Sequence, residues 1–105
     1  MIANTPAVPY FAVIFTSLRS TNDEGYREMA EKMVQLASLQ EGFLGIESAR
    51  DELGITVSYW RDLQSIENWK NHIDHSEARK KGRNDWYKSF KVRIAKVERE
   101  YGFES

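Results

Sequence analysis

The sequence contains no cysteine, only two prolines in 105 residues, and no apolar run long enough to span a membrane. The absence of cysteine excludes disulfides, thiolate metal sites, iron–sulfur clusters and thiol nucleophiles. A transmembrane helix would need about 18 consecutive apolar residues. The first residues, MIANTPAVPYF, have neither the basic region nor the apolar stretch of a signal peptide. We therefore expect a cytoplasmic protein.

The chain also lacks an excess of either positive or negative charge. Fifteen basic and sixteen acidic residues give a formal net charge of −1, without an acidic or basic tail. Neither nucleic acid nor a membrane is therefore expected as a partner. Hydrophobic residues make up 41% and charged residues 30%, as in ordinary globular domains. The length predicts one domain over residues 1–105, with an extended lead-in over residues 1–9.

The first half of the chain predicts a strand, a helix and a second strand. The stretch YFAVIFTS, residues 10–17, is apolar at almost every position and predicts a strand that is buried on both faces. Asn22 or Asp23 should cap the following helix, and Gly42 should end it. That helix is indicated by apolar residues at spacings of three and four: Tyr26, Met29, Ala30, Met33, Leu36 and Ala37.

The second half predicts a hairpin, a broken helix and a last strand. Strands at 43–50 and 55–60 flank the turn DELG, and Asp62 stands where a helix N-cap belongs. A further helical piece over 76–87 contains Gly82, which favours a break. The run FKVRIAKVEREYGF predicts a long final strand with a bulge after Ala95.

This order, β-α-β-β-α-β, predicts an α+β, ferredoxin-like fold with helices on one face of an antiparallel sheet. The first strand, however, carries apolar side chains on both faces, and so does the strand at 55–60. Two helices can cover only one face. We therefore predict a homodimer in which two sheets pack into a barrel-like core. A monomer with an open apolar face is the alternative, although such a patch favours association.

The run EGFLGIESARDELGITVSYWRDLQSIENWKNHIDHSEARKKGR resembles the body of the antibiotic biosynthesis monooxygenase superfamily. In that superfamily a glycine-ended helix leads through a "GF.G" strand to a hairpin that ends in tryptophan. A helix with an inner tryptophan or histidine follows. The resemblance covers residues 10–101 and implies a dimeric α+β barrel. Similar domains serve as quinone-forming oxygenases, haem degraders and proteins with no assigned activity.

Membership of the haem-degrading branch can be tested by comparing the positions of that branch's haem-binding residues with this sequence. That branch places a histidine that ligates iron ten residues after the helix tryptophan, and an asparagine on the first strand. Trp69 matches the tryptophan, but Arg79 stands at the ligand position and YFAVIFTS contains no asparagine. Haem is therefore disfavoured, and we expect no cofactor.

The cofactor-independent branch acts on phenols, and the resemblance implies a base, aromatic walls and an apolar pocket here. Residues 59–75, YWRDLQSIENWKNHIDH, hold both histidines and two of the three tryptophans. His72 is the candidate base. The candidate substrate-binding residues are Trp69, Tyr59, Trp60, His75 and Trp86.

Each of these residues also has a structural interpretation. The tryptophans and Tyr59 are what a packed core would contain, and His72 could be a hydrogen-bonded structural residue. His75 could cap a helix or lie in a loop. His72 and His75 could share a metal ion, but two ligands do not make a site, so no metal is expected. Two functions remain open: a monooxygenase of a small aromatic or phenolic substrate, and a non-catalytic ligand-binding or stress-related dimer.

Overall fold

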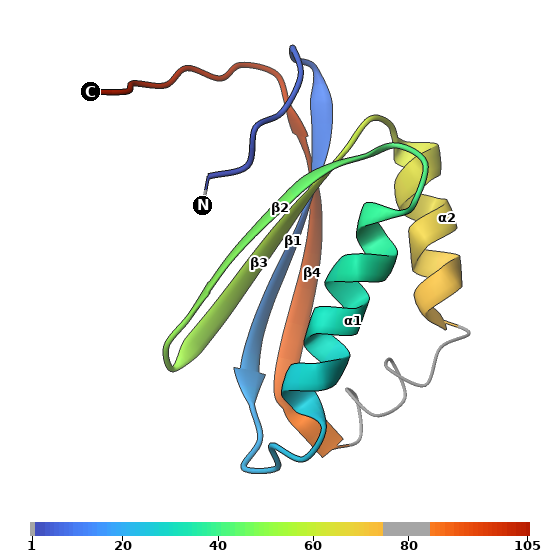
Figure 1. Ribbon diagram of the computed structural model, residues 1–105, viewed down its shortest axis with the longest axis vertical. Helices are drawn as coiled ribbons and strands as arrows, with labels where there is room; N and C mark the ends of the chain where they lie inside the picture. Colours follow the sequence, from blue (N-terminus) through green and yellow to red (C-terminus); the bar gives the residue numbers. More distant parts are fainter. Residues whose placement is uncertain (1, 75–84) are drawn as a thin grey trace.

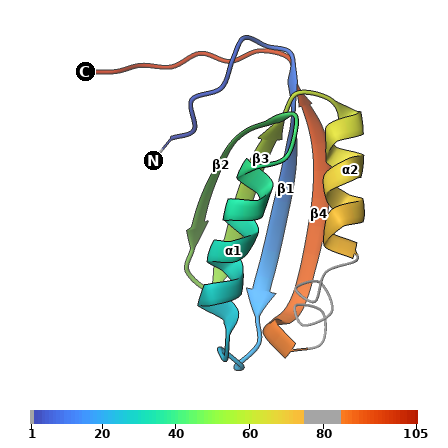
Figure 2. The ribbon, with the colours of Figure 1, turned by 45° about the vertical axis from the view of Figure 1, so that its right-hand side comes forward.

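The computed structural model describes residues 2–74 and 85–105. Four antiparallel strands form one sheet in the order β2-β3-β1-β4, and two helices pack on the same side of it (Figures 1 and 2). The element order confirms the predicted ferredoxin-like fold. The elements are β1 (Tyr10–Arg19), α1 (Tyr26–Ser38), β2 (Phe43–Arg50), β3 (Leu53–Trp60), α2 (Leu63–Asp74) and β4 (Tyr87–Val97).

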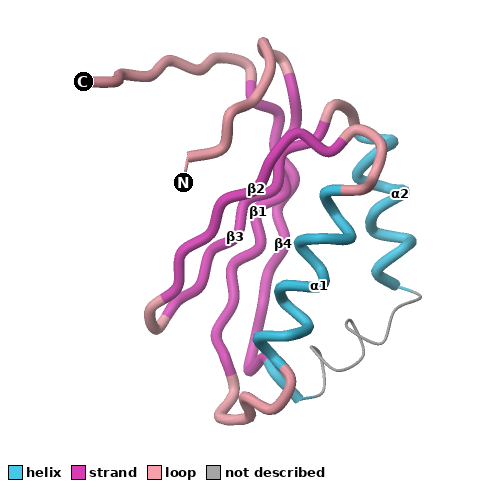
Figure 3. Tube along the Cα trace, in the orientation of Figure 1, coloured by secondary structure: helices cyan, strands magenta, loops and turns pink. Residues whose placement is uncertain are grey.

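Strand register determines which side chains share a face of the sheet. Phe11 of β1 pairs with Trp60 of β3, and the next residues, Ala12 and Tyr59, pair on the opposite side. We call the side that carries α1 and α2 the helix face, and the other side the open face (Figure 3). Successive side chains of β1 and β3 therefore point to opposite faces of the sheet, as predicted.

The hydrophobic core lies on the helix face near the end of β3. Trp60 is fully buried and packs with Ala37 of α1 and with Ile66 and Trp69 of α2. Phe43 meets the Trp60 ring edge-on, with the ring centroids 5.4 Å apart. This cluster joins both helices to the sheet.

Both chain termini lie at one end of the molecule (Figure 1). The Ala3 amide donates a hydrogen bond to Glu47 of β2, and Tyr10 shares hydrogen bonds with Thr5 and Glu100. The terminal segments therefore attach to the open face at that end of the sheet.

The predicted ends of α1 are wrong. Its N-cap is Gly25, in the left-handed conformation at φ 74°, without a side-chain cap. Asn22 instead accepts from the Glu24 amide, and Asp23 pairs with Arg19, so both side chains hold the loop before the helix. The helix ends at Ser38, four residues before Gly42.

The other boundaries agree more closely. Asp62 accepts hydrogen bonds from the Ser65 amide and hydroxyl, which confirms it as the cap of α2. β3 begins at Leu53, earlier than predicted. The bulge lies between Leu18 and Arg19, opposite the beginning of β4, and pairing is regular beside Ala95. Of the helical piece predicted over 76–87, residues 76–84 lie outside the described residues, and Tyr87 already belongs to β4.

Candidate functional site

Three of the predicted site residues stack on one another. The Trp60 and Trp69 rings lie 6.0 Å apart, and the His72 ring stacks on Trp69 at 5.6 Å with an interplanar angle of 16°. Trp60 Nε1 donates a hydrogen bond of 2.9 Å to Ser58 Oγ. The stack runs from the buried core to His72, which is exposed. A ligand could therefore reach the imidazole without displacing the indoles.

Helix geometry places His72 on the side of α2 that faces the connection between α1 and β2. Ser65 and His72 are seven residues apart, which is two helical turns, so they lie on the same side. Ser65 lies directly against Gly42, in that connection. His72 therefore lies two turns along α2 from the contact with Gly42, on the same side of the helix.

The helix face of β4 carries exposed apolar side chains. Phe90, Val92 and Ile94 pair with the helix-face residues Ser17, Phe15 and Val13 of β1. Their exposed fractions are 39%, 48% and 52%. The helices thus leave an apolar surface uncovered on this edge strand, and apolar surface of this kind is what an aromatic ligand binds.

An aromatic group borders this surface near the beginning of β4. The Phe15 ring lies 5.4 Å from both Tyr87 and Phe90, and Tyr26 of α1 lies 5.9 Å from Tyr87. Burial, together with the hydrogen bond to Tyr26, raises the pKa of Tyr87. The sequence pattern showed the alternation of Phe90, but not that Tyr87 belongs to the same strand.

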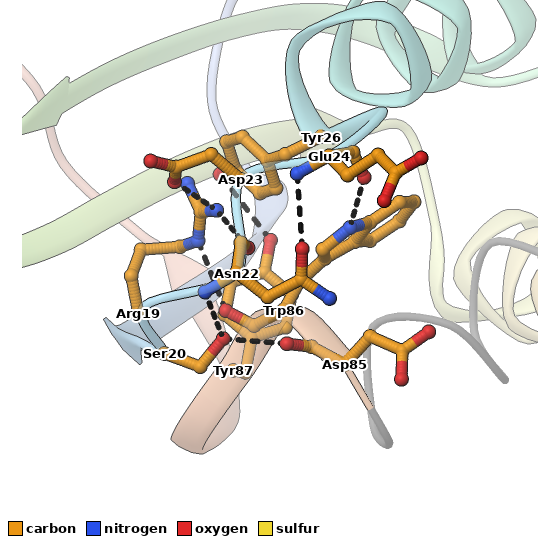
Figure 4. Close-up of polar contacts among 9 residues, drawn as sticks. All are labelled: Arg19, Ser20, Asn22, Asp23, Glu24, Tyr26, Asp85, Trp86 and Tyr87. Carbon is orange, nitrogen blue, oxygen red and sulfur yellow. Dashed lines mark hydrogen bonds and ion pairs between the residues drawn. The ribbon is translucent and has the colours of Figure 1, made fainter.

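Trp86 lies at the opposite end of the sheet from Trp60 and Trp69. It is buried, and its indole N–H donates to the carbonyl of Glu24 (Figure 4). The Trp86 carbonyl accepts from the Ser20 amide and from Arg19 Nε. These bonds attach the beginning of β4 to the loop before α1. A hollow of about 450 Å³ opens beside this attachment, lined by Asn22, Glu24, Gly25, Glu28, Met29, Lys32, Asp85 and Trp86.

Tyr59 lies on the open face, so it does not share a pocket with Trp69. Its hydroxyl donates a hydrogen bond of 2.5 Å to Glu47, and its ring meets Tyr10 edge-on. Burial and this hydrogen bond raise the pKa of Tyr59 to about 12. The same bond lowers the pKa of Glu47. Tyr59 and its neighbour Trp60, which packs on Trp69, point to opposite faces of the sheet, so Tyr59 and Trp69 lie on different sides of it.

His75 and Arg79 lie outside the described residues. The role of His75 in substrate binding therefore stays a prediction. Within residues 2–74 and 85–105, no three His, Asp or Glu side chains form a group that could hold a metal ion. No helix in that part of the chain is long and apolar enough to cross a membrane.

Comparison with known proteins identifies relatives over nearly the whole chain. The family model described as "Antibiotic biosynthesis monooxygenase" matches residues 9–81. YqjZ of Bacillus subtilis (strain 168), described as uncharacterized, is 52% identical over 105 residues, which cover 98% of this chain and 92% of YqjZ.

Solved structures share the fold at low identity. PA3566 from Pseudomonas aeruginosa has a TM-score of 0.68 and 18% identity, over 90% of this chain and 97% of that one. SnoaB from Streptomyces nogalater, described as a cofactor-independent oxygenase, has a TM-score of 0.65 and 8% identity, over 93% of this chain and 100% of SnoaB. At such identities the likeness shows the fold alone.

Proposed function

Because the chain belongs to the antibiotic biosynthesis monooxygenase family, we propose that it oxidises a small phenolic aromatic compound with dioxygen and without a metal, haem or flavin. One observation carries this proposal. The helix face combines an uncovered apolar surface on β4 with an accessible imidazole on α2. The apolar surface would bind the aromatic ring of the substrate, and the imidazole would accept its phenolic proton.

In the proposed reaction His72 acts as the general base. It takes the phenolic proton, and the resulting anion is electron-rich enough to pass an electron to dioxygen. For a hydroxylated anthrone, one methylene and one dioxygen give a carbonyl and a water, so no external reductant is needed. Trp69 holds the imidazole by stacking on it, and the buried Trp60 supports Trp69 from the other side.

The other predicted residues have different places in this proposal. Trp86 anchors the beginning of β4, which carries the apolar surface. Tyr59 belongs to the open face, on the other side of the sheet from the surface proposed to bind the substrate. His75 remains a predicted binding residue.

The test is oxygen uptake by the purified protein with hydroxylated anthrones or naphthols. A general base contributes about 100-fold or more to the rate, so His72→Ala should slow uptake at least that much. Asn71→Ala, also exposed on α2, is the matched control and should keep the wild-type rate. No uptake by the wild type, or an unchanged rate in His72→Ala, would remove the proposal.

A non-catalytic ligand-binding protein is the second candidate. It is favoured by the packing of Trp69, which is only 9% exposed between Trp60 and His72. Such a protein would bind a naphthol, measured by calorimetry, while consuming no oxygen. Naphthol binding with oxygen uptake therefore indicates the oxygenase, and naphthol binding without oxygen uptake indicates the ligand-binding protein.

We also propose that the protein is a homodimer that pairs through the open face. This face exposes Leu18, Leu53 and Ile55 by 39%, 49% and 42%, and Ile14 and Val57 lie beside them. A second copy offers the same apolar surface under a two-fold axis, and each sheet would cover the other. The terminal segments would lie at the rim of this interface.

A further inference from the structure

One row of side chains crosses all four strands on the helix face. Arg50 of β2 pairs with Gly54 of β3, Gly54 with Ser17 of β1, and Ser17 with Phe90 of β4. The Arg50 side chain lies across Gly54, where a Cβ atom would overlap its guanidinium. It reaches Ser17 on the next strand and donates to the Ser17 hydroxyl and carbonyl. Gly54 therefore provides the path by which a cation from an outer strand reaches the centre of the sheet.

Within the part of the chain that the structure describes, the guanidinium of Arg50 is held by neutral acceptors alone. Of its five N–H donors, two bond to Ser17, which is 2% exposed. Among the described residues, Arg50 forms no ion pair, whereas Arg19 and Arg61 pair with Asp23, Glu41 and Asp62. A guanidinium that bonds to a buried serine, and that meets no carboxylate among residues 2–74 and 85–105, is well suited to bind an anion bidentately.

Aromatic groups border this cation. Phe90 is the next residue in the row beyond Ser17, and cross-strand neighbours of this kind lie about 5 Å apart. Tyr87 contacts Phe90 and Phe15, and its hydroxyl lies 3.4 Å from the Tyr26 hydroxyl. Arg50 is close enough to act electrostatically on Tyr87, against the effect of burial on that pKa. The site thus combines a cation, phenolic hydroxyls and a partly exposed ring.

We propose that Arg50, positioned over Gly54 by Ser17, binds the carboxylate of an aromatic acid whose ring lies on Phe90 and the neighbouring surface of β4. This assigns a substrate class, aromatic carboxylates, to the helix face and rests on the proposed function for the ring-binding surface. A neutral phenol would bind the same surface without using Arg50. The carboxylate is preferred because its two oxygens match the planar fork of the guanidinium.

The test compares two ligands that differ by one carboxylate, 1-hydroxy-2-naphthoate and 1-naphthol, by calorimetry. The wild type should bind the acid at least tenfold more tightly. Arg50→Gln should abolish this preference and leave naphthol affinity within about twofold. Gly54→Ala should do the same by displacing the side chain, because Gly54 does not have a positive φ and alanine fits its backbone. Arg61→Gln, beyond the other end of β3, is the matched control and should keep the preference.

Several outcomes would overturn the inference: equal affinity for both ligands, binding of neither, or an acid preference that survives in Arg50→Gln. If the preference for the acid is lost in Arg50→Gln but kept in Gly54→Ala, the claim that Gly54 positions the Arg50 side chain is ruled out. Oxygen uptake separates this inference from the proposed function. If the protein prefers the acid but consumes no oxygen, the inference stands and the proposed oxygenase activity is ruled out. If it consumes oxygen with naphthol but shows no preference for the acid, the oxygenase activity stands and the inference is ruled out. Circular dichroism of each variant checks that the fold is retained.

Discussion

At the scale of single residues, the adjacent aromatic residues Tyr59 and Trp60 serve different faces of the sheet. Trp60 is fully buried among the helices, and its indole N–H is satisfied by Ser58. Tyr59 lies on the open face, where its hydroxyl donates to Glu47. Their residue types alone do not separate these roles, but the two-residue period of a strand does.

Tyr59 should make the protein sensitive to alkali. Its pKa rises from 10.0 to about 12 on folding, so its contribution to stability is complete below pH 10 and is lost as pH rises through about 12. Between pH 10 and 12 the free energy of unfolding should therefore fall less steeply in Tyr59→Phe than in the wild type. At pH 7 the same variant should lose about 1–2 kcal/mol, because a hydrogen bond to a carboxylate is removed.

Urea unfolding at a fixed protein concentration, at pH 7 and between pH 10 and 12, measures both effects. Tyr101→Phe is the control, because Tyr101 is fully exposed and its substitution should change stability by less than about 0.5 kcal/mol. A Tyr59→Phe variant that loses stability in alkali as steeply as the wild type would contradict the assignment.

At the scale of elements, the connection between α1 and β2 is locked to α2. Gly42 has a φ of +88°, and its Cα lies so close to Ser65 that a Cβ atom would overlap the serine hydroxyl. The carbonyl of Gly42 also accepts a hydrogen bond of 2.7 Å from the Arg61 amide. Gly42 therefore does not end α1, as its sequence position suggested, but joins three segments of the fold.

Gly42→Ala should be strongly destabilising. A side chain in the left-handed region costs about 1–2 kcal/mol, and overpacking against Ser65 adds to this, so we expect a loss of about 2–4 kcal/mol. Gly102→Ala is the control, because a Cβ atom there meets nothing within 4 Å. Thermal or urea unfolding of both variants measures the difference, and equal stabilities would refute the packing described for Gly42.

At the scale of the whole molecule, the sheet has one face covered by helices and one face left partly apolar. Figures 1 and 2 show both helices on the same side. Ile14 and Val57 pair at the middle of the open face. This asymmetry is the physical basis for the proposed dimer.

Val57→Glu should dissociate the proposed dimer, because a charge at the centre of an apolar interface is left without a partner. Light scattering should give twice the 12.3 kDa chain mass for the wild type and a single chain mass for the variant. Val34→Glu is the matched control. Val34 is 43% exposed on α1, away from the open face, and the variant should keep the wild-type mass. A folded wild-type monomer would rule out the dimer.

Much of the fold follows from patterns within short stretches. A continuous apolar run predicted β1, the turn DELG predicted the hairpin that contains β3, and apolar residues three and four apart predicted α1. The Asp62 cap of α2 was recognisable because its partner is three residues away. The site was less predictable. Trp60, Trp69 and His72 do come together, but Tyr59 and Trp86 lie elsewhere, and Arg50 carried no local signal at all.

The sequence by itself determined the element order and the faces of the central strands, because these depend on residue periodicity and local hydrogen bonding. It also indicated the family, through the resemblance of residues 41–83 to that superfamily. Only the tertiary structure decided that Arg50 crosses Gly54 to Ser17, that Gly42 touches Ser65, and that the helices leave the apolar side chains of β4 uncovered. Each of these contacts depends on strand register and helix placement. Both are set by packing among segments that are far apart in the chain, and residue type alone does not record them.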